Sequence, residues 1–218
     1  MSSYSETLER TDISPHLRAW LYRRRAWANK VAGDYAAAIA DATQAVELDW
    51  SDGASYARLA SILRSSERLE ESLTAGRKAV LMNPANYNHW NILALSLGDL
   101  KRWNEAAEAA GKACSLGPSS QFCGNYAITL AQAGRAVEAA EAANQASRLP
   151  AMVYGFYNLA CYRALAGDKR GALRDLHAAL DLRFADALIR DDEALRSLHG
   201  NPEFEAIVAE VDKRLRAN

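Results

Sequence analysis

The stretch AWLYRRRAWANKVAGDYAAAIADATQAVELDWSD, residues 19–52, decides the fold, because a version of it recurs four more times at near-constant spacing. Its apolar residues follow a helical spacing up to Gly33, resume that spacing at Tyr35 and stop again near Trp50. The stretch therefore predicts a helix, a tight turn and a second helix.

Two positions of this unit hold alanine in every copy. In frames of about 34 residues, the copies begin at Ala19, Gly53, Tyr87, Ser120 and Val153, the third being one residue short. The eighth slot holds Ala26, Ala60, Ala94, Ala127 and Ala160, and the twenty-seventh holds Ala45, Ala79, Ala113, Ala146 and Ala179. Methyl-sized residues at fixed slots mark close backbone approach, so we expect the two helices of each unit to press together there.

The remaining pattern resembles a known repeat. Larger core residues fill the fourth slot, glycines mark three turns and prolines close two units: Tyr22, Tyr56, Trp90, Cys123 and Phe156; Gly33, Gly134 and Gly167; Pro84 and Pro118. These residues resemble the tetratricopeptide repeat (TPR) over residues 19–184. The resemblance implies an all-α fold, an α-solenoid in which helix-turn-helix hairpins stack into a right-handed superhelix.

The expected organisation is a single domain, because stacked repeats share a continuous core. A lead-in of residues 1–18 precedes five repeats at 19–52, 53–86, 87–119, 120–152 and 153–184, and residues 185–218 form a helical cap. Ser14 and Pro15 predict the start of a helix that runs to about Ala32, and Asn201 and Pro202 predict the start of the last helix. The ending is similar to that of many bacterial TPR proteins, so we expect the natural C-terminus to be present.

Three features depart from the TPR pattern. The second helices carry Ala42, Gly76, Ala110, Ala143 and Leu176 where an aromatic residue is usual, so neighbouring units are expected to pack closely. The second repeat has no glycine at the turn between its helices. In the third repeat Gly98 stands three residues before the position of the turn glycine, which predicts a first helix that ends short.

Composition excludes several classes of partner. The net charge of −1 and the pI of about 6.4 provide no basic field for nucleic acid. No run of about 18 apolar residues and no signal peptide is present, so we expect no membrane partner and a cytoplasmic location.

The three cysteines are expected to be small packing residues, since their slots explain them without chemistry. A bridge between Cys114 and Cys123 is the alternative. The four histidines form no metal motif, and no phosphate-binding loop or nucleophile elbow occurs. We therefore expect no cofactor, no metal and no enzyme activity.

A solenoid directs its first helices toward an inner, concave groove. The residues expected to bind a partner there are Trp20, Arg23, Trp27, Lys30, Arg58, Arg64, Asn88, Asn91, Asn125, Tyr154, Tyr157 and Asn158. Trp20 and Trp27 lie on one helical stripe with arginines nearby, which suits an acidic or aromatic peptide. The alternative is that the lead-in folds over both tryptophans and buries them.

The best-known TPR peptide clamp, which holds a terminal carboxylate, is not expected here. Leu95 and Tyr154 stand where that clamp needs an amide and a lysine. The predicted function is a non-catalytic scaffold that binds a protein or peptide in the groove. The alternatives are a self-assembling homo-oligomer and a regulatory subunit of a larger complex.

Overall fold

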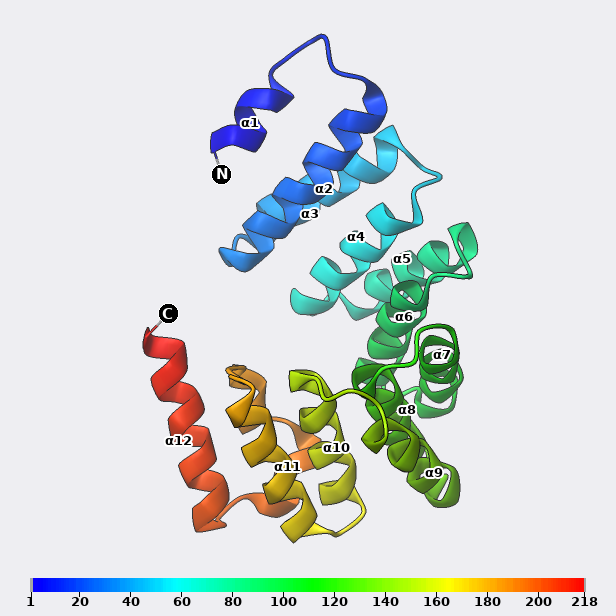
Figure 1. The fold of residues 1–218 in the computed structure, drawn as a ribbon. Coiled ribbons are helices and arrows are strands. Elements are labelled where there is room, and N and C mark those ends of the chain that lie inside the picture. Colours follow the sequence, from blue (N-terminus) through cyan, green and yellow to red (C-terminus); the bar gives the residue numbers. More distant parts are fainter. Residues whose placement is uncertain (1, 218) are drawn as a thin grey trace. The chain divides into compact units, whose positions relative to one another are not determined.

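The computed structural model describes residues 2–217, and no strand occurs among them, which confirms the all-α prediction (Figure 1). The first and last residues of the predicted lead-in and cap, 1 and 218, lie outside the described residues. The helices are α1 (Ser2–Leu8), α2 (Pro15–Val31), α3 (Tyr35–Leu48), α4 (Gly53–Ser65), α5 (Leu69–Met82), α6 (Tyr87–Asp99), α7 (Trp103–Leu116), α8 (Ser120–Gln132), α9 (Ala136–Ser147), α10 (Val153–Leu165), α11 (Lys169–Asp181) and α12 (Pro202–Ala217), with the 3₁₀ helices η1 (Ala187–Arg190) and η2 (Glu193–Leu198).

Consecutive helices pack as hairpins. Helix α2 packs on α3, α4 on α5, α8 on α9, and α10 on α11. The contacts divide the chain into two compact units, Met1–Ala109 and Ala110–Asn218. The boundary falls inside α7, and each unit is described by itself below.

The repeated alanines are buried in both units. All ten alanines of the eighth and twenty-seventh slots have no exposed surface. In the first unit, Ala26 of α2 packs in one cluster with Ala42 of α3 and Ile62 of α4, so α2 and α3 meet there at methyl-sized side chains. This confirms the prediction that backbones approach closely at these slots.

The turns inside the hairpins share one backbone conformation. The residue in the fifteenth slot has a positive φ in every hairpin: 81° at Gly33, 61° at Glu67, 56° at Lys101, 76° at Gly134 and 84° at Gly167. The second and third hairpins therefore make the same turn without glycine. The expectation that the first helix of the third repeat ends short was wrong. Lys101 takes the left-handed position, and α6 has 13 residues, like α4.

Two kinds of cap start the helices. The aspartates, asparagine and serine that precede α3, α4, α6, α8 and α11 each accept a hydrogen bond from a backbone N–H of the first turn: Asp34, Asp52, Asn86, Ser119 and Asp168. Before α5, α7 and α9 an arginine instead pairs with a glutamate three residues later, as Arg68 does with Glu71 at 2.6 Å.

The lead-in packs on one side of α2. Leu8 is buried, the Arg18 guanidinium donates to the Leu8 carbonyl at 2.8 Å, and Arg25 donates to Ser5 at 3.1 Å. Arg25 also forms two hydrogen bonds, of 2.8 and 2.7 Å, with the buried carboxylate of Asp41. Arg25 thus joins α2 to α3 by an ion pair.

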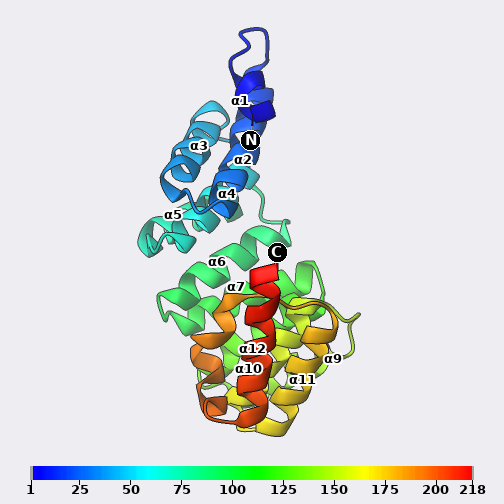
Figure 2. The same cartoon turned by 90° about the vertical axis from the view of Figure 1, so that its left-hand side faces the viewer.

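The C-terminal cap is a shortened hairpin. Asn201 caps α12 by accepting a hydrogen bond from the Glu203 N–H at 2.8 Å, as predicted. Helix α12 packs on α11 (Figure 2). Its residues Phe204, Ile207 and Val211 are buried in the same apolar cluster as Leu173 and Leu176 of α11. The 3₁₀ helix η2 precedes α12 and packs on α10. It takes the place that the first helix of a sixth repeat would occupy. The second unit therefore ends on a helix with a charged outer face.

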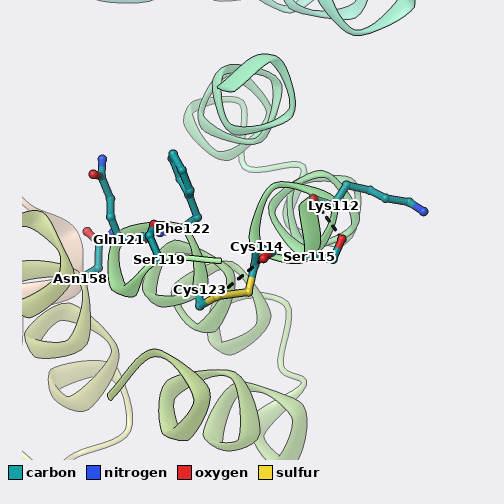
Figure 3. Close-up of a disulfide and its surroundings, with 8 residues drawn as sticks. All are labelled: Lys112, Cys114, Ser115, Ser119, Gln121, Phe122, Cys123 and Asn158. Carbon is teal, nitrogen blue, oxygen red and sulfur yellow. Dashed lines mark hydrogen bonds between the residues drawn. A yellow bond between two sulfur atoms is a disulfide. The ribbon is translucent and has the colours of Figure 1, made fainter. Parts of the chain in front are cut away.

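Cys114 and Cys123 form a disulfide that joins the end of α7 to α8, with 4.8 Å between their Cα atoms (Figure 3). The expectation that these cysteines only pack was wrong for this pair, while Cys161 is buried and unbonded. Disulfides persist mainly in oxidising compartments, and the cytoplasmic location that the sequence predicts stays a prediction.

The left-handed turn at Glu67 gives a first prediction. Replacing Glu67 by glycine should raise the free energy of unfolding by about 0.5–1 kcal/mol, because glycine adopts a positive φ without a steric cost. Glu70→Gly, an exposed position inside α5, should instead lower it by about 1 kcal/mol. Urea denaturation followed by circular dichroism measures both, and destabilisation by Glu67→Gly would contradict the turn assignment.

The disulfide gives a second prediction. Protein unfolded without reductant should show one reactive thiol, from Cys161, and protein unfolded after reduction should show all 3 cysteines. Reduction should lower the free energy of unfolding by about 2–3 kcal/mol, since a cross-link of this loop length restricts the unfolded chain. The Cys114→Ala/Cys123→Ala double variant should not respond to reductant, whereas Cys161→Ala should respond like the wild type. Three thiols before reduction would rule the bond out.

Candidate binding face

Helix α2 presents a stripe of aromatic and basic side chains on the side away from α1. Trp20 is 41% exposed and Trp27 is 42% exposed. The lead-in does not bury them, because Arg18 and Arg25 hold it on the opposite side of the helix. The alternative in which residues 1–13 cover both tryptophans is therefore wrong.

Helix α4 completes the stripe. The Arg58 guanidinium carbon lies 4.2 Å from the centre of the Trp27 ring, and the Lys30 ammonium lies 5.0 Å from it. The Arg24 guanidinium carbon lies 5.6 Å from the Trp20 ring centre. We call this surface the basic–aromatic face; its members are Trp20, Arg23, Arg24, Trp27, Lys30, Arg58 and Arg64.

The positive charges of the basic–aromatic face are only partly paired. Arg23 donates to Asp52 at 2.7 Å and Arg64 donates to Asp99 at 3.0 Å. Arg58 makes no ion pair with any carboxylate of residues 2–217, and neither does Arg24 or Lys30. The face therefore carries an excess of positive charge beside its aromatic rings.

Burial and mutual repulsion act on the charged groups of this face. Burial, with the charges of Arg64 and Arg58, lowers the pKa of Lys30 to about 8. Burial and the neighbouring charges of Arg23 and Arg24 lower the pKa of Arg58 as well. Lys30 donates to the carbonyl and the hydroxyl of Ser61, at 3.2 and 2.9 Å, so neutral acceptors supply its hydrogen bonds. An incoming anion would find cations that lack a counter-charge.

The expected asparagine sites lie on other helices. On α6, Asn88 is exposed and Asn91 is half-buried. In the second unit, Asn125 on α8 is half-buried, and the Asn158 amide on α10 donates to the Gln121 carbonyl at 2.9 Å. Asn158 thus links two helices of its own unit.

The tyrosines of α10 contact the cap. Tyr154 is 44% exposed and donates to Asp186 at 3.1 Å. Tyr157 is only 7% exposed, donates to Asp192 at 2.7 Å and stacks on Phe184, with 4.7 Å between ring centres. The expectation that Tyr157 lines an open groove was wrong, because residues 184–192 cover it.

Sequence reasoning missed the two carboxylates that flank the basic–aromatic face. Asp52 caps α4 and Asp99 ends α6, so neither belongs to the inward-facing slots of a first helix. Their positions next to Gly53 and Leu100, at helix ends, were the available signal. Arg24 was not among the residues that the sequence predicts for the site.

Among residues 2–217, no three histidine, cysteine or acidic side chains are grouped so that they could hold a metal ion. A search of the same residues for helices able to cross a membrane found none.

Comparison with solved structures gives the fold. The protein TTC0263 of Thermus thermophilus, described as a thermophilic TPR protein, matches with a TM-score of 0.65 at 16% identity, over 91% of this chain and 99% of that chain. YrrB, described as a TPR protein with an unusual peptide-binding site, matches with a TM-score of 0.59 at 21% identity, over 90% and 96%. This chain has the TPR fold. MamA matches with a TM-score of 0.57 at 15% identity, over 72% of this chain and 94% of the MamA chain.

Comparison of the sequence with protein families and with curated proteins found no relative. No protein-family model matches this TPR-fold chain, and no curated protein matches it. The likeness rests on the helical hairpins, and the basic–aromatic face has to be interpreted from its own residues.

Proposed function

We propose that the chain is a non-catalytic interaction module that binds an acidic segment of a partner protein on the basic–aromatic face. One observation carries the proposal: Arg58 is stacked on the half-exposed Trp27 ring and has no carboxylate partner among residues 2–217. Isolated, partly buried cations are costly unless an anion joins them. A partner carboxylate would supply that anion.

The same residues fit what is known of binding energetics. Tryptophan and arginine are the side chains that most often dominate interface energies. A carboxylate on Arg58 would form charge-assisted hydrogen bonds, which are about twice as strong as neutral ones. The exposed rings of Trp20 and Trp27 offer apolar area on either side for an aromatic residue of the ligand.

The TPR fold agrees with this proposal. YrrB, which has the same fold, is described as having a peptide-binding site. The asparagines of α6, α8 and α10 and the exposed ring of Tyr154 are proposed as further contacts for a partner, each on the first helix of its own repeat.

A pair of short peptides tests the proposal. Acetyl-Ala-Glu-Phe-Glu-Phe-Glu-Ala-amide should bind, and the same peptide with glutamine for each glutamate should bind at least about tenfold more weakly, a difference of about 1.4 kcal/mol. Arg58→Gln and Trp27→Ala should each weaken binding of the acidic peptide by a similar factor. Fluorescence anisotropy at low and at physiological salt measures this, and salt should weaken the interaction.

The matched control is Arg148→Gln, which removes an exposed arginine from the second unit and should leave affinity unchanged. Circular dichroism establishes that each variant is folded. Equal affinity for the acidic and the neutral peptide would contradict the proposal, and so would an equal loss in Arg148→Gln.

A further inference from the structure

The charge around Arg58 exceeds what one carboxylate can balance. Three cationic side chains of the basic–aromatic face, Arg24, Lys30 and Arg58, have no carboxylate partner among residues 2–217. The two carboxylates nearby, Asp52 and Asp99, already pair with Arg23 and Arg64. A ligand group with a single negative charge would leave most of this excess uncompensated.

The unused hydrogen-bond donors point the same way. The Nε atoms of Arg58 and Arg64 are buried and have no hydrogen-bond partner. Lys30 uses two of its three ammonium protons on Ser61, which leaves one. Buried donors of charged groups are normally satisfied, so Arg58 and Lys30 each keep a donor for which the described residues supply no acceptor.

Resting on the function proposed above, we propose that the bound segment carries a phosphoserine or phosphothreonine whose phosphoryl group sits between Arg58 and Lys30, beside the Trp27 ring. A phosphoryl group brings close to two negative charges and three acceptor oxygens at one point. A carboxylate brings one charge and two oxygens. The phosphoryl group therefore matches both the charge excess and the unsatisfied donors, and Trp27 packs against the residue that follows it.

The conditions of the test follow from the charged groups that face the site. These are Arg23, Arg24 and Lys30 on α2, Arg58 and Arg64 on α4, and the carboxylates of Asp52 and Asp99. The basic–aromatic face contains no histidine. The pKa of Lys30, about 8, lies above the range from pH 5 to pH 7 in which the peptides are compared. A phosphoserine gains its second negative charge inside this range, near pH 6.

The experiment compares three peptides that differ at one position. Acetyl-Ala-Glu-Phe-Xaa-Phe-Glu-Ala-amide is made with serine, glutamate or phosphoserine at Xaa, and each is titrated into the full chain by fluorescence anisotropy. We expect phosphoserine to bind at least about tenfold more tightly than glutamate at pH 7. Lowering the pH from 7 to 5 should remove most of that advantage, because the phosphate loses its second charge.

Two variants separate this inference from the broader function. Arg58→Gln should remove the preference for phosphoserine over glutamate, and Arg58→Lys should restore only part of it, because lysine keeps the charge without the two-pronged geometry. Arg148→Gln should keep the preference. Equal binding of the phosphoserine and glutamate peptides would overturn the phosphoryl site while leaving an acidic-segment module, whereas absence of binding by all three would overturn both.

Discussion

Contact between helices at methyl-sized side chains is the constraint on which the rest of the structure depends. All ten alanines of the two fixed slots are completely buried, so any larger side chain there would push the two helices of a hairpin apart. Close packing within hairpins also brings the first helices of neighbouring hairpins near each other. Only then can Trp27 on α2 lie 4.2 Å from Arg58 on α4, and Lys30 reach Ser61.

The period and its alanines were sufficient to predict the helical hairpins, and the capping residues Ser14 and Asn201 were sufficient to predict the starts of α2 and α12. These features depend on local residue chemistry repeated at a fixed spacing, which sequence displays directly. The turns at Glu67 and Lys101 could not be predicted in this way, because neither residue prefers a positive φ. Their conformation is imposed by the packed helices on both sides.

The disulfide and the covered tyrosine show a different limit. Cys114 and Cys123 lie in separate helices, and the fold of the chain between α7 and α8 brings their Cα atoms to 4.8 Å. Tyr157 occupies a slot that faces a groove in a regular repeat, but Phe184 at the end of the fifth repeat and Asp192 of the cap fold onto it. For the basic–aromatic face, sequence placed Trp20 and Trp27 on one stripe of α2 with arginines nearby, whereas the missing carboxylate partner of Arg58 on α4 became visible only in the fold.

The most direct test of the central constraint compares two alanines of α3. Ala45 is fully buried at the fixed slot, and Ala36 is exposed in the first turn of the same helix. If close approach at methyl-sized residues holds the hairpins together, Ala45→Leu lowers the free energy of unfolding in urea by about 1–3 kcal/mol. Ala36→Leu then changes it by no more than about 0.5 kcal/mol. Equal stability of the two variants would show that the alanine contacts do not determine the fold.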